Sequence, residues 1–330
     1  MTNKDNGIKR IAVFTSGGDA PGMNAAIRAV VRTASYYDLH VYGIHRGYAG
    51  MIEGDIFRLE KRDVANIIHR GGTILKTARS KEFMSESGRK RAYDTLMAYD
   101  IDACVAIGGN GTYTGALKFT EEYHVPFIGL PGTIDNDIYG TDSTIGFDTA
   151  CNTAVDAIDK IRDTADSHNR LFFVEVMGRH AGYIGLHTGI GSGSEMIFIP
   201  ETTIDVSTMV ENLRISAKRQ KLFSLIIVAE GNENGGAYEL ASKVEKALPE
   251  MDIRVAIIGH LQRGGSPSCS DRVLASRLGY FAVETLLHGV SNVALGIIND
   301  KLTQTPFEQA ITGNKSLNED LVKMAEILAM

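Results

Sequence analysis

The segment PGTIDND, residues 131–137, places two aspartates, Asp135 and Asp137, one residue apart directly after an apolar run. In an extended backbone their side chains would point to the same side. Two neighbouring carboxylates suit chemistry in which one accepts a hydroxyl proton and the other orients a group or holds a metal ion. A turn rich in Asp and Asn is the alternative, because both residue types are common in turns. Thr133, a donor for phosphate oxygens, and Gly132, which leaves room above it, favour the catalytic interpretation.

Two glycine-rich segments, each between an apolar run and a predicted helix, suggest contact with phosphate. In GGNGT, residues 108–112, the glycines let the backbone approach an anion, and Asn110 stands where aspartate would be a stronger magnesium ligand. In SGGDAPG, residues 16–22, Gly17 and Gly18 can present N–H groups to a phosphate, although a tight turn between strand and helix explains these residues equally well. The second segment is neither a Walker A loop nor a dinucleotide fingerprint.

Arginines near glycine turns or strand ends provide the cations that phosphoryl transfer requires. They are Arg79, Arg170, Arg179, Arg254 and Arg263. His260 precedes Arg263 by three residues, and together they could clamp a phosphate monoester, although a lone histidine is more often structural. Arg28 and Arg32 share one face of a predicted helix, which indicates either a solvated surface or a second anion site.

Several other classes of protein are disfavoured. The histidines and cysteines have no zinc-site spacing, and Ser192 in GSGSE does not fit a nucleophile elbow, so we expect neither zinc nor hydrolase chemistry. A net charge of −6 argues against nucleic-acid binding as the main function. The sequence has no apolar run near the ~18 residues of a membrane span and no signal-peptide pattern. We therefore expect a soluble cytosolic protein with reduced cysteines.

The elements that would hold these residues are short apolar runs that alternate with helices. The runs are 10–16, 103–109, 125–132, 171–178, 222–231 and 253–260, and the predicted helices are 22–35, 112–122, 146–165, 181–191, 236–247 and 270–288. Such runs indicate parallel strands buried on both faces, hence a doubly wound α/β architecture with ligands at the carboxyl ends of the strands. A chain of 330 residues favours two domains, with crossovers near residues 146 and 258.

Taken in order, six segments resemble those of bacterial ATP-dependent 6-phosphofructokinases: TSGGDAPGMNAAIRAVVR, RGGTILKTAR, IGGNGTYTGA, LPGTIDNDIYGTDSTIGFDTA, VEVMGRHAG and GHLQRGGSP. The resemblance implies a cytoplasmic, glycolytic homotetramer that transfers the ATP γ-phosphoryl group to the 1-hydroxyl of fructose 6-phosphate with Mg²⁺. It implies two doubly wound α/β domains with mainly parallel sheets and the active site in the interdomain cleft. The expected domains are a larger ATP-binding one, 1–146 plus 259–308, and a smaller sugar-phosphate-binding one, 147–258 plus 309–330.

The resemblance also assigns roles by motif position. Asp135 is expected to be the general base, Thr133 to contact the transferring phosphoryl group, and Arg79 and Arg179 to stabilise transition-state charge. The expected ATP-binding residues are Gly18, Arg79, Ser80, Gly109, Asn110, Gly111 and Thr112, with Asn110 also the metal position. The expected substrate-binding residues are Thr133, Ile134, Asp135, Asp137, Met177, Gly178, Arg179, Glu230, His260, Leu261, Gln262 and Arg263, with Arg170 and Arg254 reaching in from a neighbouring subunit.

The same resemblance implies an effector site for ADP or phosphoenolpyruvate between subunits. Its expected residues are Arg28, Arg32, Arg162, Gly193, Glu195, Arg219 and Lys221. Lys61 stands where the family usually has arginine, and Leu222 and Phe223 replace basic residues. Because a pocket with fewer cationic donors binds phosphate less tightly, we predict weakened allosteric control.

Three alternatives have discriminating features. The pyrophosphate-dependent branch of the family usually carries Asp and Lys at the positions of Gly111 and Gly132, so the two glycines favour ATP as the donor. Lipid and NAD kinases use a GGDGT turn similar to GGNGT, but PGTIDND and GGSP favour a sugar phosphate. A non-catalytic nucleotide sensor would need no base, whereas Asp135 is retained.

Asn110 keeps a carbonyl oxygen but lacks the negative charge of an aspartate, so we predict weaker magnesium binding rather than an inactive site.

Overall fold

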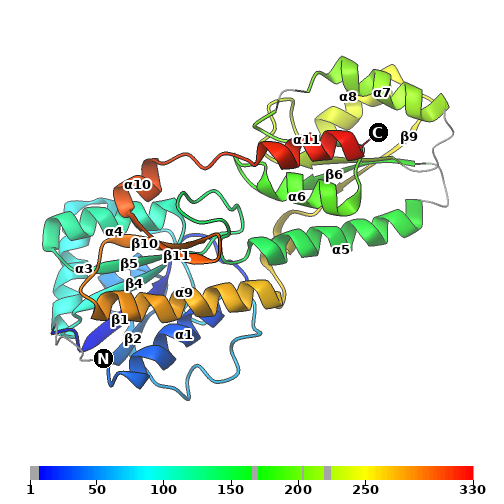
Figure 1. Ribbon diagram of the computed structural model, residues 1–330. Helices are drawn as coiled ribbons and strands as arrows, with labels where there is room; N and C mark the ends of the chain where they lie inside the picture. Colours follow the sequence, from blue (N-terminus) through cyan, green and yellow to red (C-terminus); the bar gives the residue numbers. More distant parts are fainter. Residues whose placement is uncertain (1–6, 166–169, 203, 219–223, 330) are drawn as a thin grey trace. The chain divides into compact units, whose positions relative to one another are not determined.

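The computed structural model describes residues 7–165, 170–202, 204–218 and 224–329, which divide into two compact units (Figure 1). The first unit comprises Met1–Ile134, Ile138–Thr149 and Arg263–Lys315. The second comprises Asp135–Asp137, Ala150–Gln262 and Ser316–Met330. Both units combine a sheet with surrounding helices, and each is described by itself below.

The first unit is built on a seven-stranded sheet with the order β11-β10-β5-β4-β1-β2-β3. Its strands are β1 (Arg10–Thr15), β2 (His40–Ile44), β3 (Ile56–Leu59), β4 (Ala103–Gly108), β5 (Phe127–Pro131), β10 (Val293–Ile298) and β11 (Lys301–Pro306). The five inner strands of this order, β10, β5, β4, β1 and β2, pair in parallel. The edge strands β3 and β11 each pair antiparallel with the strand beside them. All six residues of β4 are buried, as expected of a central strand covered on both faces.

Helices cover both faces of this sheet. They are α1 (Met23–Tyr36), α2 (Tyr48–Glu53), η1 (Glu82–Met84), α3 (Glu86–Ala98), α4 (Asn110–Tyr123), α9 (Cys269–Leu287) and α10 (Phe307–Thr312). Helices α1 and α9 pack closely together, since a Cβ atom on Gly279 would lie 2.6 Å from the carbonyl oxygen of Ala26. The aromatic rings of Phe14, Phe119 and Phe127 pack in the core cluster that also includes residues of α2, α3 and α10.

The second unit has a four-stranded, fully parallel sheet with the order β7-β8-β6-β9. Its strands are β6 (Arg170–Val176), β7 (Met196–Phe198), β8 (Ser224–Ala229) and β9 (Asp252–Ile257). Its helices are α6 (Tyr183–Ser192), α7 (Val206–Lys218), α8 (Ala237–Ala247) and α11 (Glu319–Leu328), and η2 (Gly259–Arg263) follows β9. Helix α5 (Phe147–Ala165) begins in the first unit and belongs to the second from Ala150 onward.

The predicted fold class, two doubly wound α/β domains with mainly parallel sheets, is confirmed. A strand overlaps each of the six apolar runs, although residues 222–223 lie outside the described part of the chain, and all six predicted helices are present. Helix α4 begins at Asn110, so the last three residues of GGNGT form its first turn rather than a preceding loop. Within the described ranges, no helix is long and apolar enough to cross a membrane.

Helices α5 and α9 begin beside each other, and a side chain of α9 caps the start of α5. The carboxylate of Asp271, which is 1% exposed, accepts hydrogen bonds from the N–H groups of Gly146 and Thr149, both at 2.8 Å, and from the Thr149 hydroxyl. Ser268 caps α9 by accepting from the Asp271 N–H, and its hydroxyl donates to the carboxylate of Asp148. The start of α5 is therefore fixed by a buried carboxylate of another helix.

Replacing Asp271 by asparagine should destabilise the first unit, because an NH₂ group would face N–H and O–H donors. We expect a loss of about 2–3 kcal/mol at neutral pH, the usual range for unsatisfied buried groups. Burial raises the pKa of Asp271 above its ordinary 3.8, although hydrogen bonds from Thr149 and Gly146 oppose the shift. Because the pKa of Asp271 is higher in the folded than in the unfolded protein, its ionisation contributes to the free energy of unfolding. This contribution is fully present below pH 3.8, the ordinary pKa, and is lost as the pH rises through the folded pKa.

The thermal midpoints of the wild type and Asp271→Asn, measured between about pH 4.5 and pH 8, test this prediction. The difference between the thermal midpoints of the wild type and Asp271→Asn should become smaller as the pH rises. Ser268→Ala, which removes the cap of α9 and the hydrogen bond to Asp148 but leaves the Asp271 carboxylate in place, should lower stability by about 1 kcal/mol. Equal midpoints for the wild type and Asp271→Asn would show that the buried carboxylate does not fix α5.

Candidate active site

Two helices of the first unit begin at the predicted phosphate turns. Helix α4 starts after Gly109 and α1 after Gly22, and neither capping residue provides a side-chain hydrogen bond. The N–H of Thr112 bonds to the carbonyl of Gly109 at 2.9 Å and closes the first turn of α4. The positive amino end of each 14-residue helix thus follows the carboxyl end of a parallel strand, which is a favourable place for an anion.

Asn110 carries a buried side-chain oxygen. Its Oδ1 atom is enclosed and has no hydrogen-bond partner among the residues that the structure describes. A carbonyl oxygen is a hard ligand suited to Mg²⁺, so this orphaned atom fits a cation better than a structural role. No group of three or more His, Cys, Asp or Glu residues forms a metal cluster among the described residues. A cation at Asn110 would therefore depend largely on oxygens of its phosphate ligand and on water.

The loop that follows Arg70 is fastened to the end of β1. The hydroxyl of Thr15 donates to the carbonyl of Lys76 at 2.7 Å, and that of Thr77 donates to the carbonyl of Gly17 at 2.5 Å. The amide of Asn24, 1% exposed, donates to the carbonyl of Arg70 at 3.0 Å and accepts from the N–H of Ile74 at 2.8 Å. These bonds hold the segment that leads to Arg79 and Ser80, and Asn24 was not among the residues predicted from the sequence.

Arg263 lies against the SGGDAPG turn. Its Nη1 atom donates to the carbonyl of Asp19 at 3.2 Å, and a Cβ atom on Gly18 would lie only 2.7 Å from that nitrogen. Gly18 therefore leaves room for a guanidinium group beside the phosphate turn. The contact adds a positive charge to the turn within the first unit.

Asp135 and Arg179 form an ion pair in the second unit. Asp135 is 3% exposed, and its Oδ2 atom lies 3.6 Å from the Nε atom of Arg179. The expected extended backbone between Asp135 and Asp137 is wrong, because Asn136 has a φ of 55° in the left-handed region. Asn tolerates this conformation better than most residues. The turn buries Asp135 and leaves Asp137 half-buried, so the two carboxylates have different environments.

The turn after β6 carries Arg179 and is held by two side chains. The N–H of Met177 donates to Oε1 of Gln262 at 2.8 Å, and the N–H of Arg179 donates to Oε1 of Glu230, also at 2.8 Å. Gln262 is fully buried, whereas His260 and Leu261 before it are exposed. The structure thus brings Met177, Arg179, Glu230 and Gln262 together, and their substrate-binding role stays a prediction.

Arg170 and Arg254 lie elsewhere in the second unit. Both bind Asp252, at 2.7 Å each, near the amino ends of β6 and β9. Arg179 follows the carboxyl end of β6, and a strand of this length spans about 20 Å. Within one chain these two arginines therefore lie at the opposite end of β6 from Arg179, and their expected role in a neighbouring subunit stays a prediction.

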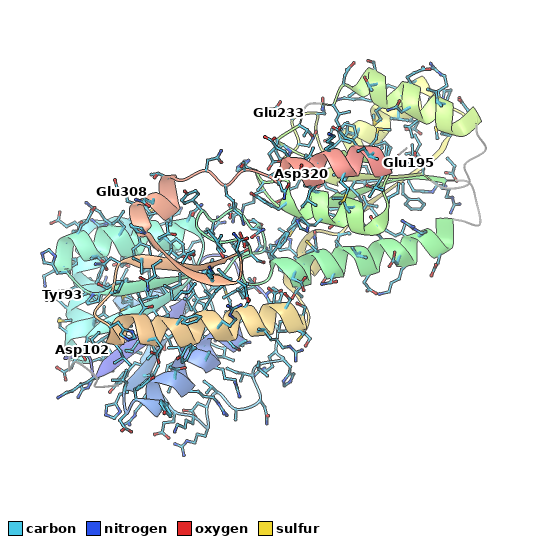
Figure 2. The ribbon with its side chains drawn as sticks, in the orientation of Figure 1. Tyr93, Asp102, Glu195, Glu233, Glu308 and Asp320 are labelled. Atoms are coloured by element: carbon cyan, nitrogen blue, oxygen red, sulfur yellow. The ribbon has the colours of Figure 1, made fainter. Side chains whose placement is uncertain are left out.

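The expected effector residues divide between the units. Arg28 is partly buried on α1, and burial together with the nearby charge of Arg32 lowers the pKa of Arg28. In the second unit the Arg162 guanidinium donates to the carbonyl of Ser192. Glu195, labelled in Figure 2, lies between α6 and β7, and Gly193 ends α6 in a left-handed conformation. Arg219 and Lys221 lie outside the described residues.

Comparison with known families identifies the family of this chain. Residues 10–286 match the family model described as phosphofructokinase. The chain belongs to the phosphofructokinase family. The resemblance inferred from the six sequence motifs is thereby confirmed.

Curated phosphofructokinases match along nearly their whole length. The chain is 56% identical over 321 residues to an ATP-dependent 6-phosphofructokinase of Cytophaga hutchinsonii, covering 97% of this chain and 98% of the relative. It is 55% identical over 323 residues to ATP-dependent 6-phosphofructokinase 1 of Thermus thermophilus, covering 98% and 100% of the two chains.

Solved phosphofructokinase structures share the fold. That of Saccharomyces cerevisiae matches with a TM-score of 0.88 and 36% identity, covering 97% of this chain but only 48% of the yeast chain. This chain therefore spans about half the length of the yeast enzyme. A pyrophosphate-dependent phosphofructokinase of Marinobacter aquaeolei matches with a TM-score of 0.83 and 25% identity. The match covers 95% of this chain and 86% of the Marinobacter chain. The phosphofructokinase fold thus occurs with either phosphoryl donor, and the choice of donor depends on particular residues.

Proposed function

We propose that the protein is an ATP-dependent 6-phosphofructokinase acting in cytoplasmic glycolysis. It transfers the γ-phosphoryl group of ATP to the 1-hydroxyl of fructose 6-phosphate and produces fructose 1,6-bisphosphate and ADP. The observation that carries the proposal is the buried carboxylate of Asp135 paired with Arg179 in a phosphofructokinase chain. A base beside a cation suits removal of a hydroxyl proton while negative charge develops on the transferring group.

The larger domain, 1–146 plus 259–308, binds the nucleotide in this proposal. The amino ends of α1 and α4 receive phosphate oxygens, since both helix starts lack side-chain caps. The ATP-binding residues are those of the sequence analysis: Gly18, Arg79, Ser80, Gly109, Asn110, Gly111 and Thr112. Arg79 is exposed, and it follows Thr77, whose hydroxyl donates to the carbonyl of Gly17, so its planar donors can bind a charged ligand at this turn.

The smaller domain, 147–258 plus 309–330, binds the sugar phosphate, together with neighbouring segments of the chain. Asp135 takes the proton of the 1-hydroxyl as its oxygen attacks the γ-phosphorus atom. Thr133 and Arg179 stabilise the charge on the equatorial oxygens of the transferring group. The turn at Met177, the carboxylate of Glu230 and the segment at His260 orient the sugar.

Asn110 would hold the divalent ion, which we propose is Mg²⁺. When bound, this ion supplies charge neutralisation at the ATP phosphates and fixes their orientation. The orphaned Oδ1 atom of Asn110 supports this assignment. Since an amide oxygen carries no net charge, it contributes less to cation affinity than a carboxylate would.

Asn110→Asp should therefore tighten magnesium binding. A carboxylate of the same size would place a full negative charge at an enclosed position, so the free Mg²⁺ concentration for half-maximal activity should fall about three- to tenfold. Calorimetry of Mg²⁺–ADP binding gives a second readout that does not depend on turnover. Asn110→Ala, which removes the oxygen, should change both quantities in the opposite direction. Identical magnesium dependence in all three proteins would remove Asn110 from the metal site.

A coupled assay with the purified protein tests the proposed reaction. Turnover with ATP, Mg²⁺ and fructose 6-phosphate, exceeding turnover with pyrophosphate, is the expected result. Faster turnover with pyrophosphate would overturn the choice of donor. A panel of other acceptors with ATP would reveal a different kinase, and nucleotide binding without any turnover would indicate a sensor.

We also propose a homotetramer with an effector site for ADP or phosphoenolpyruvate at subunit contacts. Arg28 and Arg32, one helical turn apart on α1, place two cations on the same face of that helix and support an anion site there. Weakened control is expected from the replaced basic residues. Fructose 6-phosphate saturation curves with and without ADP test this, and a large shift of the midpoint would contradict weak control.

A further inference from the structure

We propose that Gln262 is a positioning residue that acts on the phosphoryl transfer through Arg179. Its side-chain amide fixes the turn Met177–Gly178–Arg179 and thereby keeps the Arg179 guanidinium beside Asp135. This inference rests on the proposed function for the roles of Arg179 and Asp135. It gives Gln262 a different role from the substrate contact expected by motif position.

Both polar atoms of the Gln262 amide bind the protein backbone. The side chain is 0% exposed, its Oε1 atom accepts from the Met177 N–H at 2.8 Å, and its Nε2 atom donates to the Ala150 carbonyl at 3.3 Å. Because one partner donates and the other accepts, only one orientation of the amide satisfies both. Gln262 thus ties the turn after β6 to helix α5.

The turn itself needs external support. Gly178 has a φ of 143°, and Arg179 is a non-glycine residue in the left-handed region with a φ of 53°. A Cβ atom on Gly178 would lie 2.5 Å from the carbonyl oxygen of Ala181, and one on Gly231 would lie 1.7 Å from that of Arg179. A backbone in an unfavourable conformation persists when its surroundings fix it. The two side-chain anchors, Gln262 at Met177 and Glu230 at Arg179, provide that fixation.

The position of Arg179 depends on this backbone. Its side chain is 51% exposed, and its Nε atom lies 3.6 Å from the buried Oδ2 atom of Asp135. A long, half-exposed side chain keeps its direction only while its Cα atom is fixed. Without the Gln262 amide, the Met177 N–H loses its partner and the turn can relax away from Asp135. The predicted consequence is a loss of transition-state stabilisation and thus a lower kcat.

A double-mutant cycle tests the proposal. Gln262→Met has a similar length without hydrogen bonds, and it should lower kcat by about 10- to 100-fold, the size expected for misplacement by about 1 Å. In the Arg179→Ala background the same substitution should lower kcat by less than about threefold, because its effect runs through Arg179. An equal factor in both backgrounds would overturn the proposal.

Asn232→Leu is the matched control. Asn232 is also a buried amide of the second unit, and it donates to the Ile199 carbonyl at 3.3 Å and accepts from the Asn234 N–H at 2.8 Å. Asn232→Leu should lower the thermal midpoint as much as Gln262→Met does. Its effect on kcat should be small, and it should be equal in the wild-type and Arg179→Ala backgrounds. If Asn232→Leu were coupled to Arg179 as strongly as Gln262→Met, the effect would be general loosening, and the proposal would be wrong.

Gln262→Glu keeps the proposal testable if Gln262→Met folds poorly. A neutral glutamic acid can accept from Met177 and donate to Ala150, whereas its carboxylate would face the Ala150 carbonyl. The ratio of its kcat to that of the wild type should therefore fall as the pH rises and the group ionises. A pH-independent ratio would count against the proposed bonds. Wild-type kcat in Arg179→Ala would overturn the positioning role, because Gln262 could not then act through Arg179. Failure of the proposed function would be seen separately, as no turnover of ATP and fructose 6-phosphate by the wild type.

Discussion

Asp135→Asn is expected to lower kcat by about 1000-fold, within the usual range for loss of a general base. Asparagine preserves the size of the side chain but cannot accept the proton of the 1-hydroxyl. The site is suited to such a base because Asp135 is 3% exposed and faces Arg179 at 3.6 Å. The KM for fructose 6-phosphate and the thermal midpoint should change little, since the lost interaction belongs to the transition state.

The matched control is Asp137→Asn, two residues along the same turn. Asp137 is more exposed, so its loss should lower kcat only about tenfold. Both variants are measured in the coupled assay with ATP and fructose 6-phosphate, at several pH values. If Asp135→Asn kept more than a tenth of wild-type kcat, or if Asp137→Asn lost as much, the assignment of the base would be wrong.

Continuous apolar runs in the sequence predicted strands β1, β4, β5, β6, β8 and β9, but the prediction missed β2 and β10, which lie inside the first sheet. β4 and β8 are buried throughout and were found in this way. β11, with the sequence KLTQTP, is an edge strand with mostly exposed or half-buried residues, so its residues carry no such signal. β3 has four residues and β7 three, too few for a pattern to emerge.

The candidate site was predictable where its chemistry shows in residue types. Asp135 and Arg179 stand in glycine-rich motifs, and the structure pairs them. The supporting amides could not be recognised in the same way. Gln262 binds Met177 from 85 positions away, and Asn24 binds Ile74 from 50 positions away. Such bonds depend on which segments the fold brings together, and a single sequence does not encode that in its local pattern.

The conformation of single residues was a further limit. Asn136 adopts a φ of 55°, so the backbone at this position is not extended. The expectation that Asp135 and Asp137 lie on one side of an extended segment is therefore wrong. The beginning of α4 at Asn110 had a similar effect, because it moves Asn110 and Gly111 from a loop into a helix turn. A helix turn fixes the direction in which a side chain at position 111 would project.

The two glycines that favour ATP have different surroundings. A Cβ atom on Gly132 would lie 2.9 Å from Cγ2 of Ile107 and 3.0 Å from Cε of Met23, so a lysine there requires repacking of the core. A Cβ atom on Gly111 would meet nothing within 4 Å. Position 111 therefore accepts a side chain without strain, and it gives the cleaner test of donor choice.

Gly111→Asp should lower kcat/KM for ATP by about 100-fold, because like charges brought together cost several kcal/mol. The carboxylate would project from the first turn of α4, where the proposal places the nucleotide phosphates. Gly111→Ala adds bulk without charge and should lower kcat/KM less than about fivefold. Initial rates with ATP and with pyrophosphate, measured for both variants, separate repulsion from crowding. Unchanged use of ATP by Gly111→Asp would mean that the α-phosphate lies elsewhere, and an equal loss in Gly111→Ala would assign the effect to space rather than charge.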